Sequence, residues 1–370
     1  MLNIEVKVLR AWCEINLDNI EQNVKKIQEL SNGREVMGII KADAYGLGAI
    51  EIGHTLKRAG IKIFGVACID EAIELLGSGI ERDILILGGV YNEELKEASK
   101  LGFHVTIGAM EQLQYIEENG IKTKVHIKID TGMGRVGFTP EEGMEAIEKF
   151  RNSNFVKIVG VFTHLSVSDE NTESAKEFTL SQIEKFKPFQ NLDFIKYRHV
   201  LNSGGIINYH SEEVGNMVRA GILLYGVYDN GPVEGMKRAF TLKSKILFLK
   251  VLQEEMEISY GRQGKGHIGE MIATVSIGYA DGLKRQLSNV GSLKVAGHSC
   301  PIVGKICMDM CMIRIPKELR EQVKVGDSVE VIGEDLFEKT ELLNGSVYDI
   351  LTGIGRRVPR VYIKEKLWQK

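Results

Sequence analysis

One lysine stands in the sequence context with the clearest chemical potential. Lys41 directly follows the apolar run 36–40, and Tyr45, Gly46 and Gly48 come soon after it. The apolar run predicts a buried strand, and the glycines predict a tight turn into a helix. Lys41 is therefore expected at the carboxyl end of a strand, where α/β folds keep their active sites. A lysine in a dry pocket loses its proton more easily, and its neutral amine can form a Schiff base with an aldehyde.

A lone lysine is more often an ordinary surface residue. The residues expected near Lys41 in the fold therefore determine whether it is a functional residue. Eight apolar or β-branched runs alternate with amphipathic, helix-like segments over the first two thirds of the chain. They are 35–41, 61–67, 83–88, 103–108, 124–130, 156–163, 197–202 and 217–226. This alternation predicts an α/β fold with a (β/α)₈ barrel, and a doubly wound sheet is the alternative.

Several polar groups lie at the ends of these runs, in the turns that follow them or within the last run, so we expect them at one rim of the barrel. They are Lys41, Arg135, His164, Ser203 and Arg219. Ser203 precedes two glycines and could bind a phosphate through its hydroxyl and nearby N–H groups. A lysine amine and a phosphate site on one rim suggest pyridoxal 5′-phosphate as the cofactor. The two arginines, as permanent donors, could hold cofactor ring atoms or a substrate carboxylate.

The pattern changes after about residue 240, where short strand-like runs are separated by Gly, Asp and Asn. We expect a barrel over residues 16–240 and a mostly β domain over residues 241–370. Residues 1–15 look like a strand that could pack with this second domain. Within the second domain, Tyr279 lies in the turn 278–282, and its phenol could carry a proton.

Composition excludes several other classes of protein. The 370 residues have a net charge of −3 and 44% hydrophobic content, so we expect no nucleic-acid partner. No apolar stretch is long enough for a membrane span, and no signal-peptide core is present at the N-terminus. The five cysteines lack metal-type spacing, so we expect no metal site and a cytoplasmic location.

These motifs together resemble the bacterial alanine racemases, which are fold-type III pyridoxal-phosphate enzymes. The resemblance runs from Ala11–Asn16 to Arg357–Arg360. Its specific motifs are 41–46, 130–135, 217–222, 278–282 and 307–309. It implies a cytoplasmic homodimer that interconverts L- and D-alanine and supplies D-alanine for peptidoglycan of the cell wall.

The resemblance also implies a role for each site residue. Lys41 would hold the cofactor and carry a proton on one face of the substrate, and Tyr279 of the partner subunit would serve the other face. Arg219 would donate to the pyridine nitrogen, and Arg135 with Met308 of the partner subunit would bind the substrate carboxylate. Lys128 occupies a position that is often carbamylated. Further contacts to the cofactor would come from Tyr45, Arg135, His164, Ser203, Gly221, Ile222 and Tyr348.

Some positions depart from the family's pattern and leave alternatives open. Lys305 and Met310 flank the motif 307–309 and differ from its common neighbours, which puts the choice of substrate in doubt. A serine racemase of the same family is the close alternative. Two alternatives come from other functional classes. They are a decarboxylase on the same barrel and a non-catalytic pyridoxal-phosphate carrier.

Overall fold

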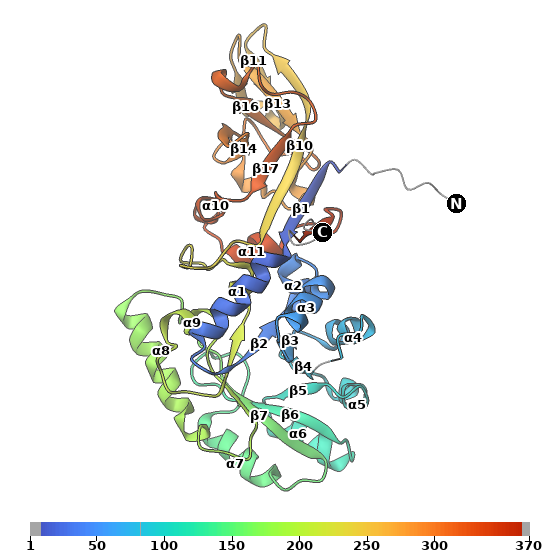
Figure 1. Ribbon diagram of the computed structural model, residues 1–370, viewed down its shortest axis with the longest axis vertical. Coiled ribbons are helices and arrows are strands. Elements are labelled where there is room, and N and C mark those ends of the chain that lie inside the picture. Colours follow the sequence, from blue (N-terminus) through green and yellow to red (C-terminus); the bar gives the residue numbers. More distant parts are fainter. Residues whose placement is uncertain (1–8, 82, 365–370) are drawn as a thin grey trace, which may run out of the picture. The chain divides into compact units, whose positions relative to one another are not determined.

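The computed structural model describes residues 9–81 and 83–364, which form two compact units (Figure 1). One unit runs from Asn19 to Arg238. The other combines the N-terminal segment up to Asp18 with the chain from Ala239 onward. The first unit therefore lies between two parts of the second in the sequence.

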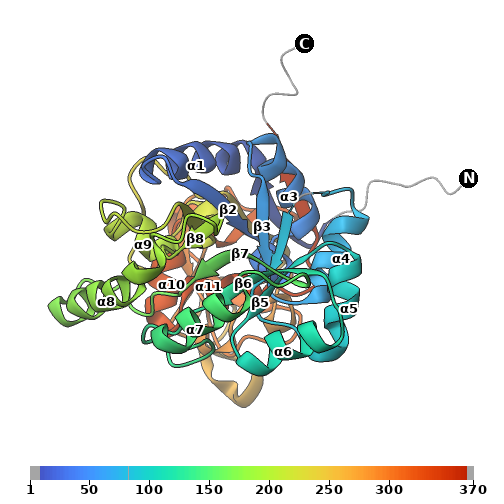
Figure 2. The ribbon, with the colours of Figure 1, turned by 90° about the horizontal axis from the view of Figure 1, so that it is seen from below.

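The unit 19–238 is a closed barrel of eight parallel strands, as the alternating pattern predicts (Figure 2). Neighbouring strands in the sequence are also neighbours in the barrel, and β2 closes it by pairing with β9. The strands are β2 (Glu35–Ile39), β3 (Ile63–Val66), β4 (Asp83–Ile86), β5 (His104–Ile107), β6 (Thr123–Lys128), β7 (Val156–Phe162), β8 (Tyr197–His199) and β9 (Met217–Ala220).

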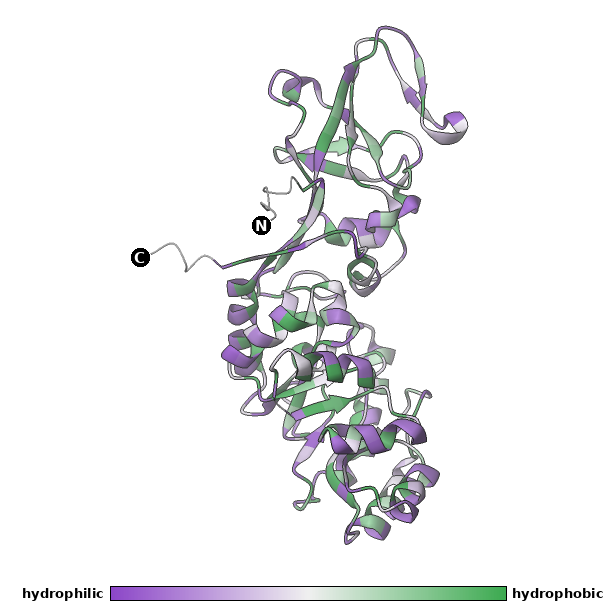
Figure 3. Ribbon diagram, turned by 90° about the vertical axis from the view of Figure 1, so that its right-hand side faces the viewer, coloured by the Kyte–Doolittle hydropathy of each residue, from purple (hydrophilic) through white to green (hydrophobic). Residues whose placement is uncertain are grey.

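Helices surround the strands, and the longer ones are amphipathic because one apolar stripe of each is buried. In the first helix Ile20, Val24 and Ile27 are fully buried, in agreement with the predicted stripe. Figure 3 shows apolar strands inside and polar residues on the outer helix faces. The helices are α1 (Leu17–Leu30), α2 (Lys41–Gly46), α3 (Ala49–Arg58), α4 (Ile69–Gly77), α5 (Asn92–Lys100), α6 (Met110–Glu118), α7 (Pro140–Phe150), α8 (Glu173–Phe186) and α9 (Ser203–Asn208).

The second unit is mostly β, as predicted. Its main sheet has the order β15-β14-β17-β10-β1-β18, with β13 and β16 attached to β10, and β11 pairs with β12. The N-terminal strand β1 lies between β10 and β18. Its elements are β1 (Ala11–Asn16), β10 (Phe240–Val251), β11 (Met256–Ile258), β12 (Gly264–Gly266), β13 (Met271–Val275), β14 (Ser292–Val295), β15 (His298–Pro301), β16 (Cys311–Ile315), β17 (Ser328–Ile332), β18 (Arg360–Ile363), α10 (Leu336–Leu342) and α11 (Val347–Thr352). The expected strand within residues 1–15 is described only from residue 9 onward.

The structure corrects one barrel prediction that affects the site. The run 217–226 was expected to be a single strand, but β9 ends at Ala220 and a 3₁₀ turn follows at Ile222–Tyr225. Gly221 lies between them with φ −112° and ψ −100°, a backbone conformation outside the strand region. Gly221 and Ile222 are therefore in the loop that follows the strand, where their N–H groups are not used by the sheet.

Candidate active site

The segment that carries Lys41 has an unusual backbone. The sequence placed Lys41 at the end of a strand, but β2 ends at Ile39, and Lys41 begins α2. The next four residues, Ala42–Tyr45, have φ between 52° and 59°, so they form a turn of left-handed helix. This conformation costs L-residues roughly 1–2 kcal/mol each, so surrounding contacts must hold it.

Two carboxylates hold this left-handed turn in place. Glu71, on α4, accepts hydrogen bonds from the N–H of Ala42 and of Ala67, both at 2.7 Å. Asp43 accepts from the N–H of Ala49, also at 2.7 Å. These contacts tie the turn to the neighbouring strand and helix. Lys41, which precedes the strained segment, and Tyr45, which is its last residue, therefore have fixed backbone positions.

The amine of Lys41 lies in a cationic environment. The side chain is accessible to solvent in this unit, yet enough of the barrel rim surrounds the amine to desolvate it. This desolvation lowers the pKa of Lys41, the charges of Arg135 and Arg219 lower it further, and Glu71 opposes them. A lowered pKa increases the fraction of neutral amine, which is the nucleophilic form.

Arg219, on β9, is held by acceptors that carry no charge. Its Nη1 donates to the carbonyl of His199 at 2.8 Å, and its Nη2 donates to the carbonyls of Thr163 and Val200 at 2.8 and 2.9 Å. Nη2 also donates to Nδ1 of His164 at 3.2 Å. Among the described residues, Nε of Arg219 has no acceptor, which leaves one N–H for a ligand.

His164 lies two residues after β7 and is kept neutral. Burial lowers its pKa well below the ordinary value, and the charges of Arg219, Lys128 and Arg135 add to this effect. Because Arg219 can only donate, Nδ1 of His164 is the acceptor and the ring proton is on Nε2. His164 and Arg219, both expected at this rim, are therefore in direct contact.

Arg135 is positioned by a loop that folds around Asp130. The Asp130 carboxylate accepts from the N–H groups of Gly132, Gly134 and Arg135 at 2.9, 3.1 and 3.2 Å. Burial works against it, but the N–H groups of Gly132 and Gly134 lower the pKa of Asp130, so it stays ionised. The Arg135 side chain is exposed and remains free to meet an anion.

Ser203, Gly221 and Tyr45 form a small cradle of polar groups. The N–H of Gly221 donates to Oγ of Ser203 at 3.3 Å. A Cβ on Gly221 would lie 2.4 Å from Oη of Tyr45, so only glycine lets this hydroxyl approach the backbone. A side chain at Gly204 would also meet a close neighbour. A Cβ there would lie 2.7 Å from Oγ of Ser168.

Lys128, the last residue of β6, is a buried amine with a 6% exposed residue surface. Its Nζ donates to the carbonyl of Ile129 at 3.3 Å and lies 5.1 Å from the centre of the Phe162 ring. Burial, followed by the charge of Arg219, lowers the pKa of Lys128 to about 7. A substantial fraction of neutral amine is therefore present near neutral pH.

This burial predicts how stability depends on pH. The unfolded state binds more protons than the folded state between the folded pKa of about 7 and the unfolded value of 10.5, so stability rises with pH in this window. Lys128→Met removes the cost of the buried charge. We expect it to stabilise the protein below pH 7, by up to about 5 kcal/mol, and progressively less as pH rises towards 10. Urea unfolding in CO₂-free buffers at several pH values measures this. A variant that gains the same stability at every pH would contradict it.

Tyr279 and Met308 lie in the other unit, next to each other. The N–H of Tyr279 donates to the carbonyl of Cys307 at 3.0 Å, and that of Ala280 donates to the carbonyl of Met308 at 3.1 Å. Tyr279 is 42% exposed and Met308 is 51% exposed. The buried carboxylate of Asp281 accepts from the N–H of Gly278 at 2.9 Å and thereby fixes the turn.

The predicted site residues therefore fall into two groups. The barrel brings together Lys41, Tyr45, Lys128, Arg135, His164, Ser203, Arg219, Gly221 and Ile222. The other unit carries Tyr279, Met308 and Tyr348, the last on α11. Any active site that combines residues of the barrel with residues of the other unit remains a prediction.

The sequence interpretation missed three histidines inside the barrel. His104, His126 and His199 lie on β5, β6 and β8 and are at most 1% exposed. Their rings contact one another across the barrel interior. Each lies in or beside one of the eight apolar runs, and this pattern was the available signal.

A glycine makes room for the middle ring. A Cβ on Gly160, in β7, would lie 2.1 Å from Nδ1 of His126. Gly160→Ala should therefore displace the His126 ring and destabilise the protein by about 1–3 kcal/mol. Gly77→Ala is the matched control, because a Cβ at that helix end meets nothing within 4 Å. Chemical denaturation of both variants measures the difference. Equal stabilities would show that the barrel interior can accommodate the methyl group.

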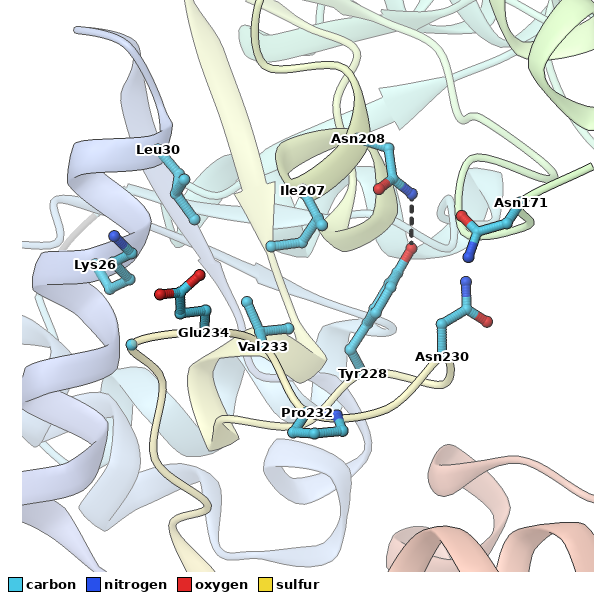
Figure 4. A pocket seen from close by; sticks show the side chains of 11 residues that line it. Lys26, Leu30, Asn171, Ile207, Asn208, Tyr228, Asn230, Pro232, Val233 and Glu234 are labelled. Atoms are coloured by element: carbon cyan, nitrogen blue, oxygen red, sulfur yellow. Dashed lines mark hydrogen bonds between the residues drawn. The ribbon is translucent and has the colours of Figure 1, made fainter.

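The rest of the described residues offers a surface pocket, but no metal cluster and no membrane-spanning helix. No group of three or more His, Cys, Asp or Glu residues within 9–81 and 83–364 is arranged to hold a metal ion. No helix in the described part of the chain is both long and apolar enough to cross a membrane. A surface pocket of about 540 Å³ lies beside α9, where Tyr228 accepts a hydrogen bond from Asn208 (Figure 4). None of the predicted site residues lines it.

The class of protein follows from this architecture: a (β/α)₈-barrel enzyme with a lysine in a cationic site, joined to a mostly β domain. Profiles of the alanine racemase N-terminal and C-terminal domains match residues 15–229 and 239–362. The chain belongs to the alanine racemase family, whose members are isomerases.

Individual relatives agree with this assignment. The alanine racemase of Fusobacterium nucleatum is 45% identical over 355 residues, which cover 96% of this chain and all of that protein. A solved alanine racemase of Clostridium difficile 630 has a TM-score of 0.87 and 35% identity, and the match covers 96% of each chain. One from E. faecalis has the same TM-score with 34% identity, over 97% of this chain and 99% of the other.

Proposed function

We propose that this protein interconverts L- and D-alanine with pyridoxal 5′-phosphate, by a two-base mechanism. Lys41 carries the proton on one face of the substrate, and Tyr279 of the partner subunit carries it on the other. One base would return the proton to the face it came from, whereas two bases on opposite faces invert the centre. The observation that carries the proposal is the lowered pKa of Lys41 beside Arg135 and Arg219, in a chain of this family.

The residues of the barrel fit the proposed cofactor. Its aldehyde would be held by the amine of Lys41, and its phosphate by Tyr45, Ser203 and the backbone at Gly221 and Ile222. The family resemblance adds Tyr348, which belongs to the other unit, as a further phosphate contact. The close approach of Tyr45 to Gly221 provides a cradle that any side chain at position 221 would fill. When bound, the cofactor supplies an electron sink that lowers the barrier to removal of the α-proton.

The two arginines suit the two groups that still need a partner, which are the basic ring nitrogen of the cofactor and the anionic carboxylate of the substrate. Nε of Arg219 would be available to donate to the ring nitrogen of the cofactor, and His164 supports that guanidinium. Because arginine keeps its proton, the ring nitrogen would stay unprotonated, which would limit side reactions such as transamination. Arg135, with Met308 of the partner subunit, binds the substrate carboxylate.

The cofactor assignment has a direct test. The purified protein should absorb as a pyridoxal-phosphate enzyme, and borohydride should bleach this absorbance and add the pyridoxyl mass to the peptide that contains Lys41. A label on another lysine, or no label after incubation with the cofactor, would contradict the proposed site.

Substrate choice has a separate test, because the family contains close alternatives. We expect faster racemisation of L-alanine than of L-serine, measured as kcat/KM for each. Preference for L-serine would favour the serine racemase alternative. Release of carbon dioxide from a basic amino acid would favour the decarboxylase. The match of the second domain over residues 239–362 counts against a carrier that consists of the barrel alone.

Dimerisation, carbamylation and the biological role complete the proposal. Tyr279 and Met308 are partly exposed, which suits residues that complete a site in a partner subunit, and a fully active monomer in sedimentation would refute this.

The neutral amine of Lys128 can add carbon dioxide, with release of a proton, to give a carbamate near Arg135. The product, D-alanine, would serve cytoplasmic synthesis of peptidoglycan precursors.

A further inference from the structure

A line of polar side chains crosses the inside of the barrel, behind Arg219. It begins at Asp83, the first residue of β4, and continues through His104 on β5, His126 on β6 and His199 on β8. The three histidines are between 0% and 1% exposed. Such buried polar groups are stable only when each has a partner, so their connections must be complete.

The distances connect these groups into one chain. Nδ1 of His199 lies 3.1 Å from Nη1 of Arg219, and Nε2 of His199 lies 2.9 Å from Nδ1 of His126. Nε2 of His126 lies 3.0 Å from Nδ1 of His104. Nε2 of His104 lies 3.3 Å from Oδ1 of Asp83, although this last contact is not aligned as a regular hydrogen bond.

The groups at the two ends of this line of side chains, Arg219 and Asp83, determine the position of every proton on the three rings. Arg219 can only donate, so Nδ1 of His199 must accept, and the neutral ring then carries its proton on Nε2. The same argument applies to His126 and then to His104. Ionised Asp83 can only accept, so it requires the same direction. Both ends therefore select the Nε2–H tautomer for all three rings.

Charges around the chain agree with neutral rings. Burial is the largest cause that lowers the pKa of His126 and His199 well below the ordinary value, followed by His104 for the former and Arg219 for the latter. At the far end, the contact with His104 holds the pKa of Asp83 low, and Lys124 adds to this effect. The acceptors of Arg219 described above are all uncharged.

We propose that Asp83, His104, His126 and His199 form a one-way hydrogen-bonded relay that positions Arg219 from the opposite end of the barrel. Arg219 is held firmly without a carboxylate in contact, so its positive charge is not neutralised at the site. The nearest fixed negative charge in the relay is separated from it by three neutral rings. This inference rests on the proposed function, in which the relay holds Nε of Arg219 in position as a hydrogen-bond donor with its full positive charge.

Nitrogen-15 NMR of the full-length protein, labelled at its eight histidines, tests the relay with and without the cofactor. Imidazole N–H and lone-pair nitrogens have well-separated shifts, so tautomers are read directly. We expect His104, His126 and His199 to be Nε2–H tautomers that stay neutral between about pH 5.5 and pH 8. Resonances are assigned by replacing each histidine with glutamine in turn. Mixed tautomers, or a protonated ring among the three near neutral pH, would overturn the proposal.

A double-variant cycle tests whether the ends set the direction. Asp83→Asn should keep the single set of tautomers because Arg219 still donates. Arg219→Met should keep it because Asp83 still accepts, but it should make His199 protonatable within the same pH range. Only the double variant should show shifts averaged between the two directions. Arg219→Lys, which retains a cationic donor, is the matched control and should resemble the wild type.

The outcomes separate the relay from the proposed function. A double variant that keeps the single tautomer set would show that the ends do not control the direction, and would overturn the relay. The wild-type spectrum remains decisive if the Met variant does not fold. These spectra need no turnover, so failure to racemise alanine would leave the relay intact, and mixed tautomers would leave the racemase assignment intact.

Discussion

Lys41→Ala should abolish racemisation, with a loss in kcat/KM of at least about 10⁴-fold. The variant lacks both the amine that holds the cofactor and a proton carrier, and positioned acid–base groups alone contribute roughly 10²–10⁴-fold. Alanine racemisation followed by polarimetry or by a D-amino-acid oxidase assay measures the loss. Borohydride should no longer fix the cofactor to the peptide that contains residue 41.

The control for this variant is Lys62→Ala. Lys62 is exposed and lines a polar pocket with Asp83 and Tyr197, at the amino ends of the barrel strands. Its removal should leave the rate unchanged within about twofold, as is usual for surface substitutions. Lys41 itself is accessible, so its alanine variant should fold normally. A folded Lys41→Ala protein with substantial activity would exclude the proposed mechanism.

Tyr279→Phe should reduce racemisation by about 10²–10⁴-fold while one half of the reaction survives. The remaining base, Lys41, still serves one face of the substrate. In deuterium oxide, one enantiomer of alanine should therefore exchange its α-hydrogen without inverting, and the other enantiomer should exchange much more slowly. Proton NMR of each enantiomer with the variant measures both rates.

The free energy of unfolding of Tyr279→Phe should equal that of the wild type, because Tyr279 is 42% exposed and no described residue hydrogen-bonds to its hydroxyl. Tyr91→Phe is the matched control, since Tyr91 is 78% exposed at the beginning of α5. Its rates should equal those of the wild type. If Tyr279→Phe slowed exchange of both enantiomers equally, the phenol would not be the base of a single face.

Local sequence patterns were sufficient for the architecture and for the placement of several polar residues at one rim, whereas the other site residues rest on the family resemblance and stay predictions. Period-2 and period-3.6 patterns depend only on which face of a strand or helix is buried, so eight strand–helix alternations predicted the barrel. The carboxyl ends of parallel strands meet at one rim, and the chain order of the motifs therefore placed Lys41, His164 and Arg219 together. In the structure Nη2 of Arg219 lies 3.2 Å from Nδ1 of His164, which is compatible with this rule.

Tertiary contacts decided what the patterns could not. A left-handed turn at Ala42–Tyr45 has no clear signature in residue types, because Ala and Tyr avoid this conformation and only Asp43 tolerates it. It depends on the carboxylate of Glu71, which comes from another helix. The end of β9 at Ala220 also escaped prediction, since the apolar run continues into the 3₁₀ turn that follows.

The line of histidines illustrates the same division. Sequence alone determined that three histidines lie in or beside apolar strand runs, but a buried histidine can have many kinds of partner. Closure of the barrel brings strands β4, β5, β6, β8 and β9 around one interior, and Gly160 leaves the space for the central ring. Which nitrogen faces which partner depends on distances of about 3 Å between residues far apart in the chain, and only the folded structure fixes these distances.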